Sequence, residues 1–178
     1  AGKAERPRPL GREKIKEGLK RDRNGMSEPP RHRVPAKQRL VLDTNIWLDW
    51  LVFGDTGIAR IRQLQGAGHL EICIDAVCEA ELARVLGYPF GKRKLENAEQ
   101  QRAIAQCRRI ATRIGAAASA AERARLPTCR DPDDQKFLEA ALAAHAGWLI
   151  TKDRALLELA RKRTRPVPFT IATPDEFS

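Results

Sequence analysis

Short apolar runs alternate with longer stretches of helical periodicity from residue 39 to the end of the chain. Consecutive apolar residues predict buried strands, which we place at 39–43, 69–74, 148–151 and 167–171. The periodic stretches between them predict helices at 44–52, 58–65, 75–86, 131–146 and 154–163. Residues 95–125 are rich in Ala, Arg, Glu and Gln, which favour helix. Strands that alternate with helices indicate an α/β fold with a parallel sheet.

The first 37 residues differ from the remainder in pattern and in charge. They contain five prolines and almost no apolar periodicity, so they cannot bury enough surface to offset the entropy of ordering. Residues 1–39 hold 13 basic and 5 acidic side chains (net +8), whereas residues 40–178 hold 20 and 18 (net +2). We expect a basic, disordered tail over 1–37 and one domain over 38–178. Such a charge distribution indicates a polyanionic partner, most simply nucleic acid.

The composition excludes other classes of protein. Hydrophobic residues make up 42% of the chain, but no apolar run approaches the roughly 18 residues of a membrane helix. The first thirty residues show no apolar segment of a secretory signal. The four cysteines form no C-x-x-C pair, which argues against a zinc site. We expect a cytoplasmic protein with reduced thiols and no membrane contact.

Acidic residues stand where predicted strands end. Asp43 ends the first strand, Asp75 follows the second, and Asp153 follows the strand at 148–151. The carboxyl ends of parallel strands meet at one edge of a sheet, where α/β folds bind ligands. The simpler interpretation is that each carboxylate caps the next helix, a role worth about 1 kcal/mol. That interpretation fits Asp75 best, because a helix follows it directly.

Helical phase separates the acidic residues of the sequence DPDD at 131–134. The apolar stripe of the helix that follows consists of Phe137, Leu138, Ala141 and Leu142. At about 100° per residue, Asp134 lies near the centre of this stripe and Asp133 is turned about 100° away. Asp131 stands at the natural N-cap. A carboxylate on a buried face, such as that of Asp134, is costly unless it is paired or binds a metal ion.

The helix at 75–86 offers two further carboxylates. Its apolar face is formed by Cys78, Leu82, Val85 and Leu86. Glu79 and Glu81 flank this face on opposite sides, and phase alone does not choose between them.

Convergence of these carboxylates would create strong repulsion. Two like charges about 5 Å apart at an effective dielectric near 20 repel by roughly 3 kcal/mol. A hard divalent cation removes this repulsion, and a ligand set of oxygen atoms selects Mg²⁺ or Mn²⁺. With a polyanionic partner, such a cluster indicates metal-assisted hydrolysis of phosphodiester bonds. The sequence shows no Ser–His or Cys–His set for a covalent mechanism.

Four segments, in this order, resemble the PIN-domain ribonucleases: RLVLDTNIWLDWL at 39–51, EAELARVL at 79–86, DPDDQKFLEAAL at 131–142 and WLITKDRALLEL at 148–159. The closing IATPDEF at 171–177 resembles bacterial PIN proteins described as toxins of toxin–antitoxin pairs. The resemblance covers about residues 38–178. It implies a three-layer α/β/α sandwich around a parallel sheet of about four to five strands. It also implies Mg²⁺- or Mn²⁺-dependent endonucleolytic cleavage of single-stranded RNA that leaves 5′-phosphate and 3′-hydroxyl ends.

The resemblance also implies roles for individual residues. Its four acidic positions match Asp43, Glu81, Asp134 and Asp153, which would be the catalytic metal ligands. The preference for Glu81 over Glu79 comes from the resemblance alone. Asn45 matches a polar neighbour that orients the first carboxylate, and the hydroxyl of Thr151 would support the site. The basic tail and the long segment 95–125 depart from compact family members and leave the RNA target open.

Basic residues near these positions are candidates for RNA binding. Lys92, Arg93 and Lys94 follow the helix that carries Glu81, while Lys152 and Arg154 flank Asp153. All five would hold RNA phosphates near the metal. Solvated surface is an equally good account of Lys152 and Arg154. Aromatic residues make up only 5% of the chain, which does not indicate a base-stacking platform.

Three other interpretations remain. A phosphatase of the haloacid dehalogenase type needs a second Asp two residues after the first, where this chain has Asn45. A non-catalytic PIN-like module that binds nucleic acid would lack an acidic ligand, and none is missing. The third interpretation is that the main role of the protein is to bind a partner protein, such as an antitoxin that blocks the site, and it is compatible with nuclease activity. The expected partners are therefore RNA, an antitoxin protein and a second copy of the chain.

Overall fold

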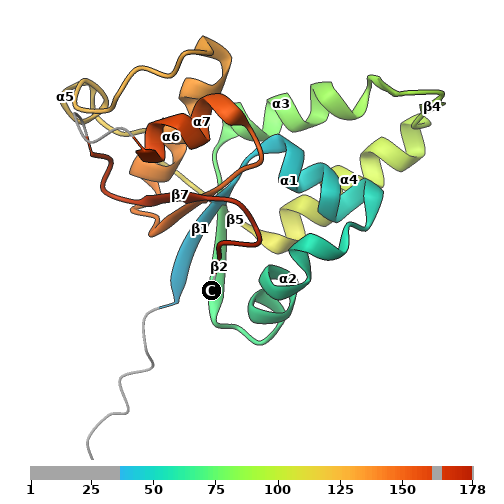
Figure 1. Cartoon of the computed structure of the whole chain (residues 1–178). Coiled ribbons are helices and arrows are strands. Elements are labelled where there is room, and N and C mark those ends of the chain that lie inside the picture. Colours follow the sequence, from blue (N-terminus) through green and yellow to red (C-terminus); the bar gives the residue numbers. More distant parts are fainter. Residues whose placement is uncertain (1–36, 162–165, 178) are drawn as a thin grey trace, which may run out of the picture. The chain divides into compact units, whose positions relative to one another are not determined.

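A five-stranded parallel sheet forms the centre of the protein (Figure 1). The computed structural model describes residues 37–161 and 166–177, which belong to one compact unit, Pro35–Ser178. In their order across the sheet, the strands are β5 (Ala111–Arg113), β2 (Leu70–Ile74), β1 (Gln38–Leu42), β6 (Trp148–Ile150) and β7 (Thr170–Ala172). All neighbouring strands are parallel. The predicted disordered tail, apart from residue 37, lies outside the described residues.

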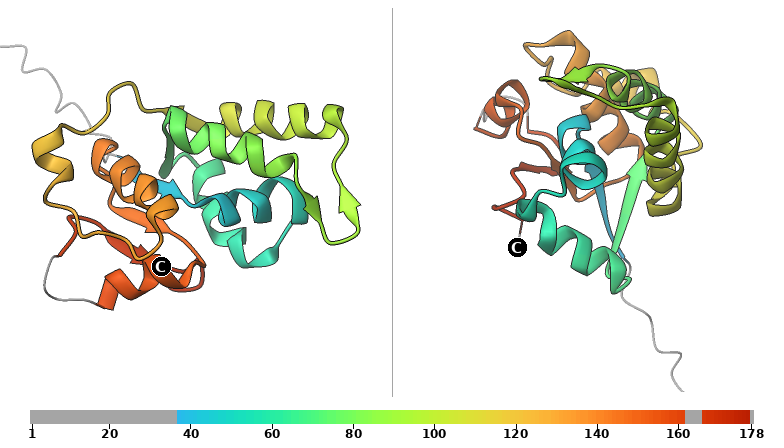
Figure 2. Two further views of the ribbon diagram at one scale, coloured as in Figure 1. Left: turned by 90° about the horizontal axis from the view of Figure 1, so that it is seen from above. Right: turned by 90° about the vertical axis from the view of Figure 1, so that its right-hand side faces the viewer.

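Helices connect the strands and pack around the sheet (Figures 1 and 2). The α-helices are α1 (Thr44–Leu48), α2 (Ala59–Gly66), α3 (Ala76–Leu86), α4 (Asn97–Ile110), α5 (Ala120–Arg123), α6 (Gln135–Ala143) and α7 (Arg154–Arg161). Helix α1 continues as the π-helix η1 (Asp49–Phe53), and the short 3₁₀ helices η2 (Thr56–Ile58) and η3 (Pro132–Asp134) precede α2 and α6. No helix within the described ranges is long and apolar enough to cross a membrane.

The central strand is buried on both of its faces. Leu40, Val41 and Leu42 are each at most 1% exposed. Because successive side chains of a strand point to opposite faces, this burial requires a cover on each side of the sheet. The prediction of an α/β sandwich around a parallel sheet is therefore confirmed. The four cysteines are free and buried in the same core.

Two parts of the chain take structures that the sequence analysis did not predict. The helix expected over 95–125 ends at Ile110, and the next residues join the sheet as β5. This strand pairs with β2, whose backbone groups would otherwise form an open edge, so strand pairing overrides helix propensity. The basic residues at 92–94 belong to a small antiparallel hairpin of β3 (Pro89–Phe90) and β4 (Arg93–Lys94). Gly91 turns it with a φ of 63°, which favours glycine.

The ends of the other predicted elements shift by a few residues. The helix expected at 131–146 begins as η3 and ends at Ala143, while the last strand occupies Thr170–Ala172 rather than 167–171. The predicted helix 154–163 is present as far as Arg161, and its last two residues lie outside the described part of the chain.

The strand register brings the candidate residues to one edge of the sheet. Leu42 at the end of β1 pairs with Ile150 at the end of β6. The next residues are Asp43 and Thr151, and the backbone N–H of Asp43 donates to the carbonyl of Ile150 over 3.0 Å. The carboxyl edge of the sheet therefore holds the first and last motifs side by side.

Candidate active site

Asp43 lies at the junction of β1 and α1 and is only 2% exposed. Its Oδ2 accepts a 2.7 Å hydrogen bond from the hydroxyl of Thr151, and its Oδ1 accepts a longer one, 3.4 Å, from the backbone N–H of Asn45. Burial raises the pKa of the Asp43 carboxyl above its ordinary value, the bond from Thr151 lowers it, and the nearby charge of Asp153 raises it further. The side chain of Asn45 is exposed, so its contact with Asp43 is made by the backbone.

Thr151 links Asp43 to Asp153. The hydroxyl of Thr151, which is fully buried, accepts a 2.9 Å hydrogen bond from the backbone N–H of Asp153 while it donates to Asp43. The half-buried side chain of Asp153 caps α7, because its Oδ1 accepts from the N–H groups of Ala155 and Leu156 over 2.6 and 3.3 Å. The capping interpretation is therefore correct for Asp153, and its charge still reaches Asp43.

The three aspartates of the DPDD sequence have separate environments. Asp131 and Asp133 are exposed, and Oδ1 of Asp131 caps η3 by accepting from the N–H of Asp133 over 2.9 Å. Asp134 is half-buried, as the helical phase predicts. Burial raises the pKa of Asp134 to about 7, with further increases from the charges of Asp153 and Asp43. Three carboxylates from three segments therefore lie within electrostatic reach of one another.

Glu79 and Glu81 lie on different sides of α3. Glu79 is 7% exposed and pairs with two arginines of α4 and β5. Its Oε1 lies 2.6 Å from Nη2 of Arg108, and its Oε2 lies 3.9 Å from Nη1 of Arg113. Glu81 is half-buried and faces α1, because its Oε1 accepts a 3.3 Å hydrogen bond from the hydroxyl of Thr44, next to Asp43. Glu79 is thus committed to the contact of α3 with α4 and β5.

Lys136 is a residue of this region that the sequence analysis missed. Its Nζ lies 2.5 Å from Oε2 of Glu81, and its side chain is only 15% exposed. The charge of Lys136 also lowers the pKa of Asp134, although less than the surrounding effects raise it. The only sequence signal for Lys136 was its place two residues after Asp134, and a lysine in an amphipathic helix normally indicates solvent.

The predicted RNA-binding residues differ in whether carboxylates of the protein already pair with their charges. Lys152 is held by two carboxylates, with Nζ 2.7 Å from Oδ2 of Asp49 and 2.9 Å from Oδ2 of Asp55. Lys152 would have to leave both carboxylates to hold a phosphate. Arg154 is exposed and, together with Arg130, Lys152 and Asp153, lines an open depression in the surface.

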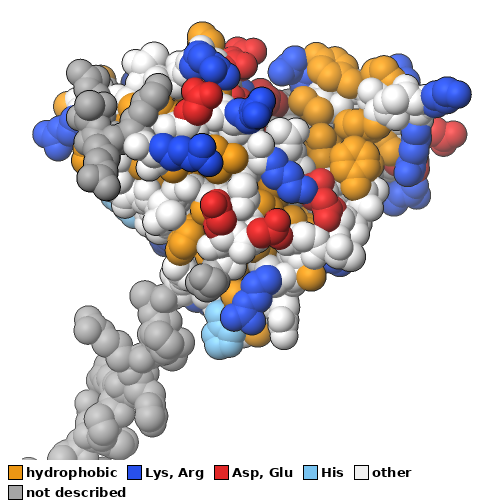
Figure 3. Space-filling model, in the orientation of Figure 1, with side chains coloured by type: hydrophobic (Ala, Val, Ile, Leu, Met, Phe, Trp, Pro, Cys, Tyr) orange, Lys and Arg blue, Asp and Glu red, His pale blue; other side chains and the backbone are white. Residues whose placement is uncertain are grey.

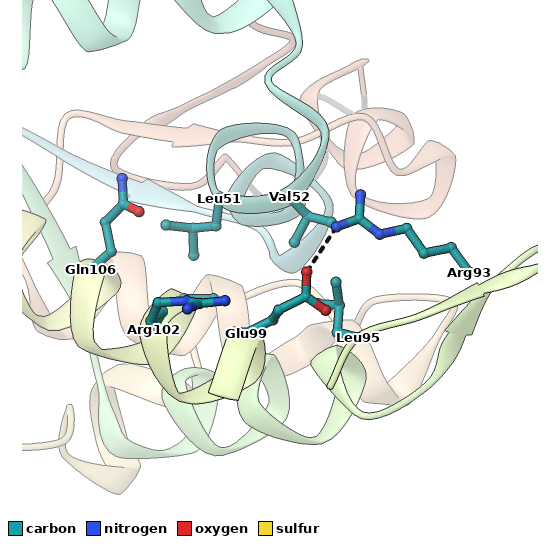
Figure 4. A pocket seen from close by; sticks show the side chains of 8 residues that line it. Leu51, Val52, Arg93, Leu95, Glu99, Arg102 and Gln106 are labelled. Carbon is teal, nitrogen blue, oxygen red and sulfur yellow. Dashed lines mark hydrogen bonds and ion pairs between the residues drawn. The ribbon is translucent and has the colours of Figure 1, made fainter. Parts of the chain in front are cut away.

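The basic hairpin lies beyond the end of α3. Lys92 and Lys94 are exposed and form no ion pair with any residue that the structure describes, whereas Arg93 pairs with Glu99 over 3.1 Å. Figure 4 shows this last pair at the rim of a cavity of about 260 Å³, which contains none of the acidic candidates. The cavity is lined by Leu51, Val52, Arg93, Leu95, Glu99, Arg102, Ala103 and Gln106.

The acidic residues have the chemistry of a site for a hard divalent cation. Asp43, Asp134 and Asp153 make no ion pair with Lys or Arg within residues 37–161 and 166–177. Burial without such a counter-charge is consistent with the raised pKa values of Asp43 and Asp134. All donors are carboxylate or hydroxyl oxygens, the set that Mg²⁺ and Mn²⁺ prefer. Over the same ranges, no three acidic, His or Cys side chains stand close enough together to hold one metal ion as they are. The donor set therefore fits such a cation, and side chains would have to turn to ligate it.

Comparison with known proteins agrees with the fold. The PIN domain family matches residues 39–155, a range that contains all four acidic candidates. No curated protein shows a significant match. One solved structure with this fold is the crystal structure of VapBC2 from Rickettsia felis bound to a DNA fragment from their promoter. The TM-score is 0.55 at 18% identity, over 75% of this chain and 97% of that chain.

At 18% identity this structural likeness concerns the fold. The family match covers well over half of the chain and includes β1, α3, α6 and β6, the elements that carry or adjoin the carboxylates. The protein therefore belongs to the PIN domain family, a family of nucleases.

Proposed function

We propose that the protein is an endoribonuclease that hydrolyses phosphodiester bonds of single-stranded RNA and depends on Mg²⁺ or Mn²⁺. The observation that supports this most is the group formed by Asp43, Asp134 and Asp153 at the carboxyl edge of the sheet. The charge of Asp153 raises the pKa of Asp43, the charges of Asp153 and Asp43 raise the pKa of Asp134, and no Lys or Arg of the described ranges pairs with any of the three. Membership of a nuclease family makes phosphodiester hydrolysis the reaction class.

In this proposal Asp43, Glu81, Asp134 and Asp153 hold the cation through their carboxylate oxygens. When bound, such a cation supplies electrophilic stabilisation of the phosphate and lowers the pKa of a water molecule. Thr151 holds Oδ2 of Asp43, and the backbone N–H of Ala155 holds Oδ1 of Asp153. These contacts orient one oxygen of each of two ligands, and other side chains of the group would still have to turn before three of them could hold one ion.

The substrate proposal rests on charge. The chain carries a net charge of +10, and residues 1–39 contribute +8 of it. Lys92 and Lys94 on the hairpin and Arg154 beside Asp153 are exposed cations that would bind RNA phosphates. We propose that the basic segment 1–37 adds affinity for RNA and that residues 38–178 form the nuclease domain.

We further propose that the protein is the toxin of a toxin–antitoxin pair, since the related fold from Rickettsia felis was solved as a VapBC2 complex. Its surface offers a place for a protein partner. Phe53 and Tyr88 are 54% and 48% exposed, and the rings of Phe53 and Phe90 meet edge to face with their centroids 5.4 Å apart. Figure 3 shows hydrophobic side chains gathered on this face between basic ones. An antitoxin or a second copy of the chain would cover such a patch.

The decisive experiment is cleavage of a mixed-sequence single-stranded RNA by the purified protein with Mn²⁺, with Mg²⁺ and with EDTA. We expect cutting only with a divalent cation and none with Asp43→Asn. In EDTA the variant should unfold at the same or a higher temperature than the wild type, because a buried charge is removed. An unfolded Asp43→Asn protein would show instead that this residue is a structural cap.

Two further measurements separate the alternatives. A folded wild type that binds the RNA but cuts it with neither ion would be a non-catalytic binding module. Hydrolysis of p-nitrophenyl phosphate without RNA cleavage would identify a phosphatase. We expect no such hydrolysis, because the position of the second phosphatase Asp holds Asn45, whose side chain is exposed.

A further inference from the structure

A lysine occupies the acidic site and binds one of its proposed ligands. Lys136 lies in the first turn of α6, two residues after Asp134. Its side chain is 15% exposed, far less than is usual for a lysine. Its ammonium group lies 4.9 Å from the centroid of the Phe137 ring and donates to the backbone carbonyl of Asp133. Neighbouring residues of η3 and α6 therefore hold the ammonium of Lys136 in addition to its contact with α3.

The partner of this ammonium is Glu81, and both oxygens of that carboxylate are engaged. Oε2 lies 2.5 Å from Nζ of Lys136, and Oε1 accepts from the hydroxyl of Thr44 over 3.3 Å. Arg84 also approaches Oε2, at 3.5 Å, but the arginine side chain is 56% exposed and its interaction is screened by solvent. Lys136 is therefore the main counter-charge of Glu81.

The other three acidic candidates have no such counter-charge. Within the described ranges, Asp43, Asp134 and Asp153 form no ion pair, whereas Glu81 pairs with Lys136. A divalent cation would thus be attracted first to the three aspartates. Glu81 could join them only by leaving the ammonium of Lys136, and the charge of the incoming cation would repel that ammonium.

We propose that Lys136 is a resident counter-cation that keeps Glu81 out of the metal site until a divalent cation binds, when the ion and Lys136 exchange places on this carboxylate. The inference rests on the proposed metal-dependent function and makes Lys136 a positioning residue for Glu81. A lysine suits this exchange, because its ammonium is a compact charge with three donors on a flexible stem that can swing toward water. In the cation-free protein the same contact neutralises the charge of the half-buried Glu81.

The test is the affinity for Mn²⁺, measured by calorimetry in a double-mutant cycle on the full chain. Lys136→Met keeps the apolar stem and removes the competitor, so Mn²⁺ should bind about tenfold more tightly than to the wild type. In the Glu81→Gln background the same Lys136→Met change should alter the affinity by less than about twofold. A simple through-space repulsion between Lys136 and the ion would give an equal gain in both backgrounds.

Two controls keep the result specific. Arg154→Met removes one exposed positive charge beside Asp153 without touching Glu81, and its gain in Mn²⁺ affinity should be clearly smaller. Lys136→Gln serves as a second variant if Lys136→Met does not fold. In EDTA, both Lys136 variants should unfold at a lower temperature than the wild type, and Mn²⁺ should raise their unfolding temperatures by more than it raises that of the wild type.

Three outcomes would overturn the exchange. If Lys136→Met binds Mn²⁺ no more tightly than the wild type does, the lysine does not compete with the ion, and the proposed function still stands. An equal gain with and without Glu81 would make Lys136 a distant charge only. If neither wild type nor variant binds Mn²⁺, the exchange and the metal-dependent function fail together.

Discussion

The hydroxyl of Thr151 donates a hydrogen bond to Oδ2 of Asp43 over 2.7 Å, although 108 positions separate the two residues in the chain. They meet because β1 and β6 are neighbours in the sheet and each residue directly follows its strand. The same hydroxyl accepts from the backbone N–H of Asp153. One buried, uncharged group therefore holds the carboxylate of Asp43 and the backbone of Asp153, two of the residues to which we assign the cation.

We predict that Thr151→Val lowers RNA cleavage by about 10–100-fold, the usual cost of removing a hydrogen bond that orients a metal ligand. The variant keeps the shape of the side chain but leaves Asp43 without its short hydrogen bond. Thr151→Ser retains the hydroxyl and should stay close to the wild type. Initial rates and Mn²⁺ titrations on the three proteins would test this, and equal rates for the valine and serine variants would contradict it.

Asp134→Asn and Asp133→Asn form a matched pair, because the two residues are adjacent and differ in burial. We expect the Asp134 change to reduce cleavage by about 100-fold or more, since a lost ligand weakens the stabilisation of the phosphate by several kcal/mol. Asp133 is exposed and should be replaceable with near-normal activity. Rates with Mn²⁺ would decide between them, and an equally deep loss for Asp133→Asn would refute the assignment by helical phase.

The raised pKa of Asp134 predicts how stability depends on pH in the absence of metal. The folded carboxyl has a pKa of about 7, whereas its ordinary value is 3.8. Between these values the folded protein binds more protons than the unfolded one, so stability falls as the pH rises from about 4 to 7. The unfolding temperature in EDTA should be higher at pH 5.5 than at pH 7.5.

Asp134→Asn supplies the control for this pH dependence. Its unfolding temperature in EDTA should change less between the two pH values than that of the wild type, and Asp133→Asn should behave like the wild type. Saturating Mn²⁺ should reduce or reverse the loss of stability at pH 7.5, because the cation binds the deprotonated carboxylates. The same pH dependence in wild type and Asp134→Asn would remove Asp134 as its source.

The local sequence pattern was sufficient to predict the elements that position the acidic residues. Three apolar residues, Leu40, Val41 and Leu42, were enough to predict the central strand, and the parallel sheet then placed Asp43 and Asp153 at one edge. The phase of α6 relative to its apolar stripe was enough to separate Asp134 from Asp133. These predictions succeeded because the helical period of apolar residues and the end of an apolar run can both be read from residues that are close together in the chain.

Features that depend on distant partners could not be predicted in this way. The strand β5 pairs with the edge that β2 offers, although two of its three residues, Ala111 and Arg113, favour helix. The ion pair of Lys136 with Glu81 requires α6 to lie beside α3, and the sequence around each residue does not predict that contact. The environments of Glu79 and Glu81 likewise differ because Arg108 of α4 faces only one of them.

The two glutamates of α3 give a last pair of contrasting predictions. Glu79→Gln removes a charge that is paired with Arg108 over 2.6 Å, so the free energy of unfolding should fall by about 1–2 kcal/mol. Once folded, this variant should cleave RNA at a rate near that of the wild type. Glu81→Gln should lose about 100-fold or more in cleavage, because a proposed ligand is removed, with a smaller change in stability. Urea unfolding and cleavage rates on both variants would test this, and a deeper loss of cleavage in Glu79→Gln would exchange the roles of the two residues.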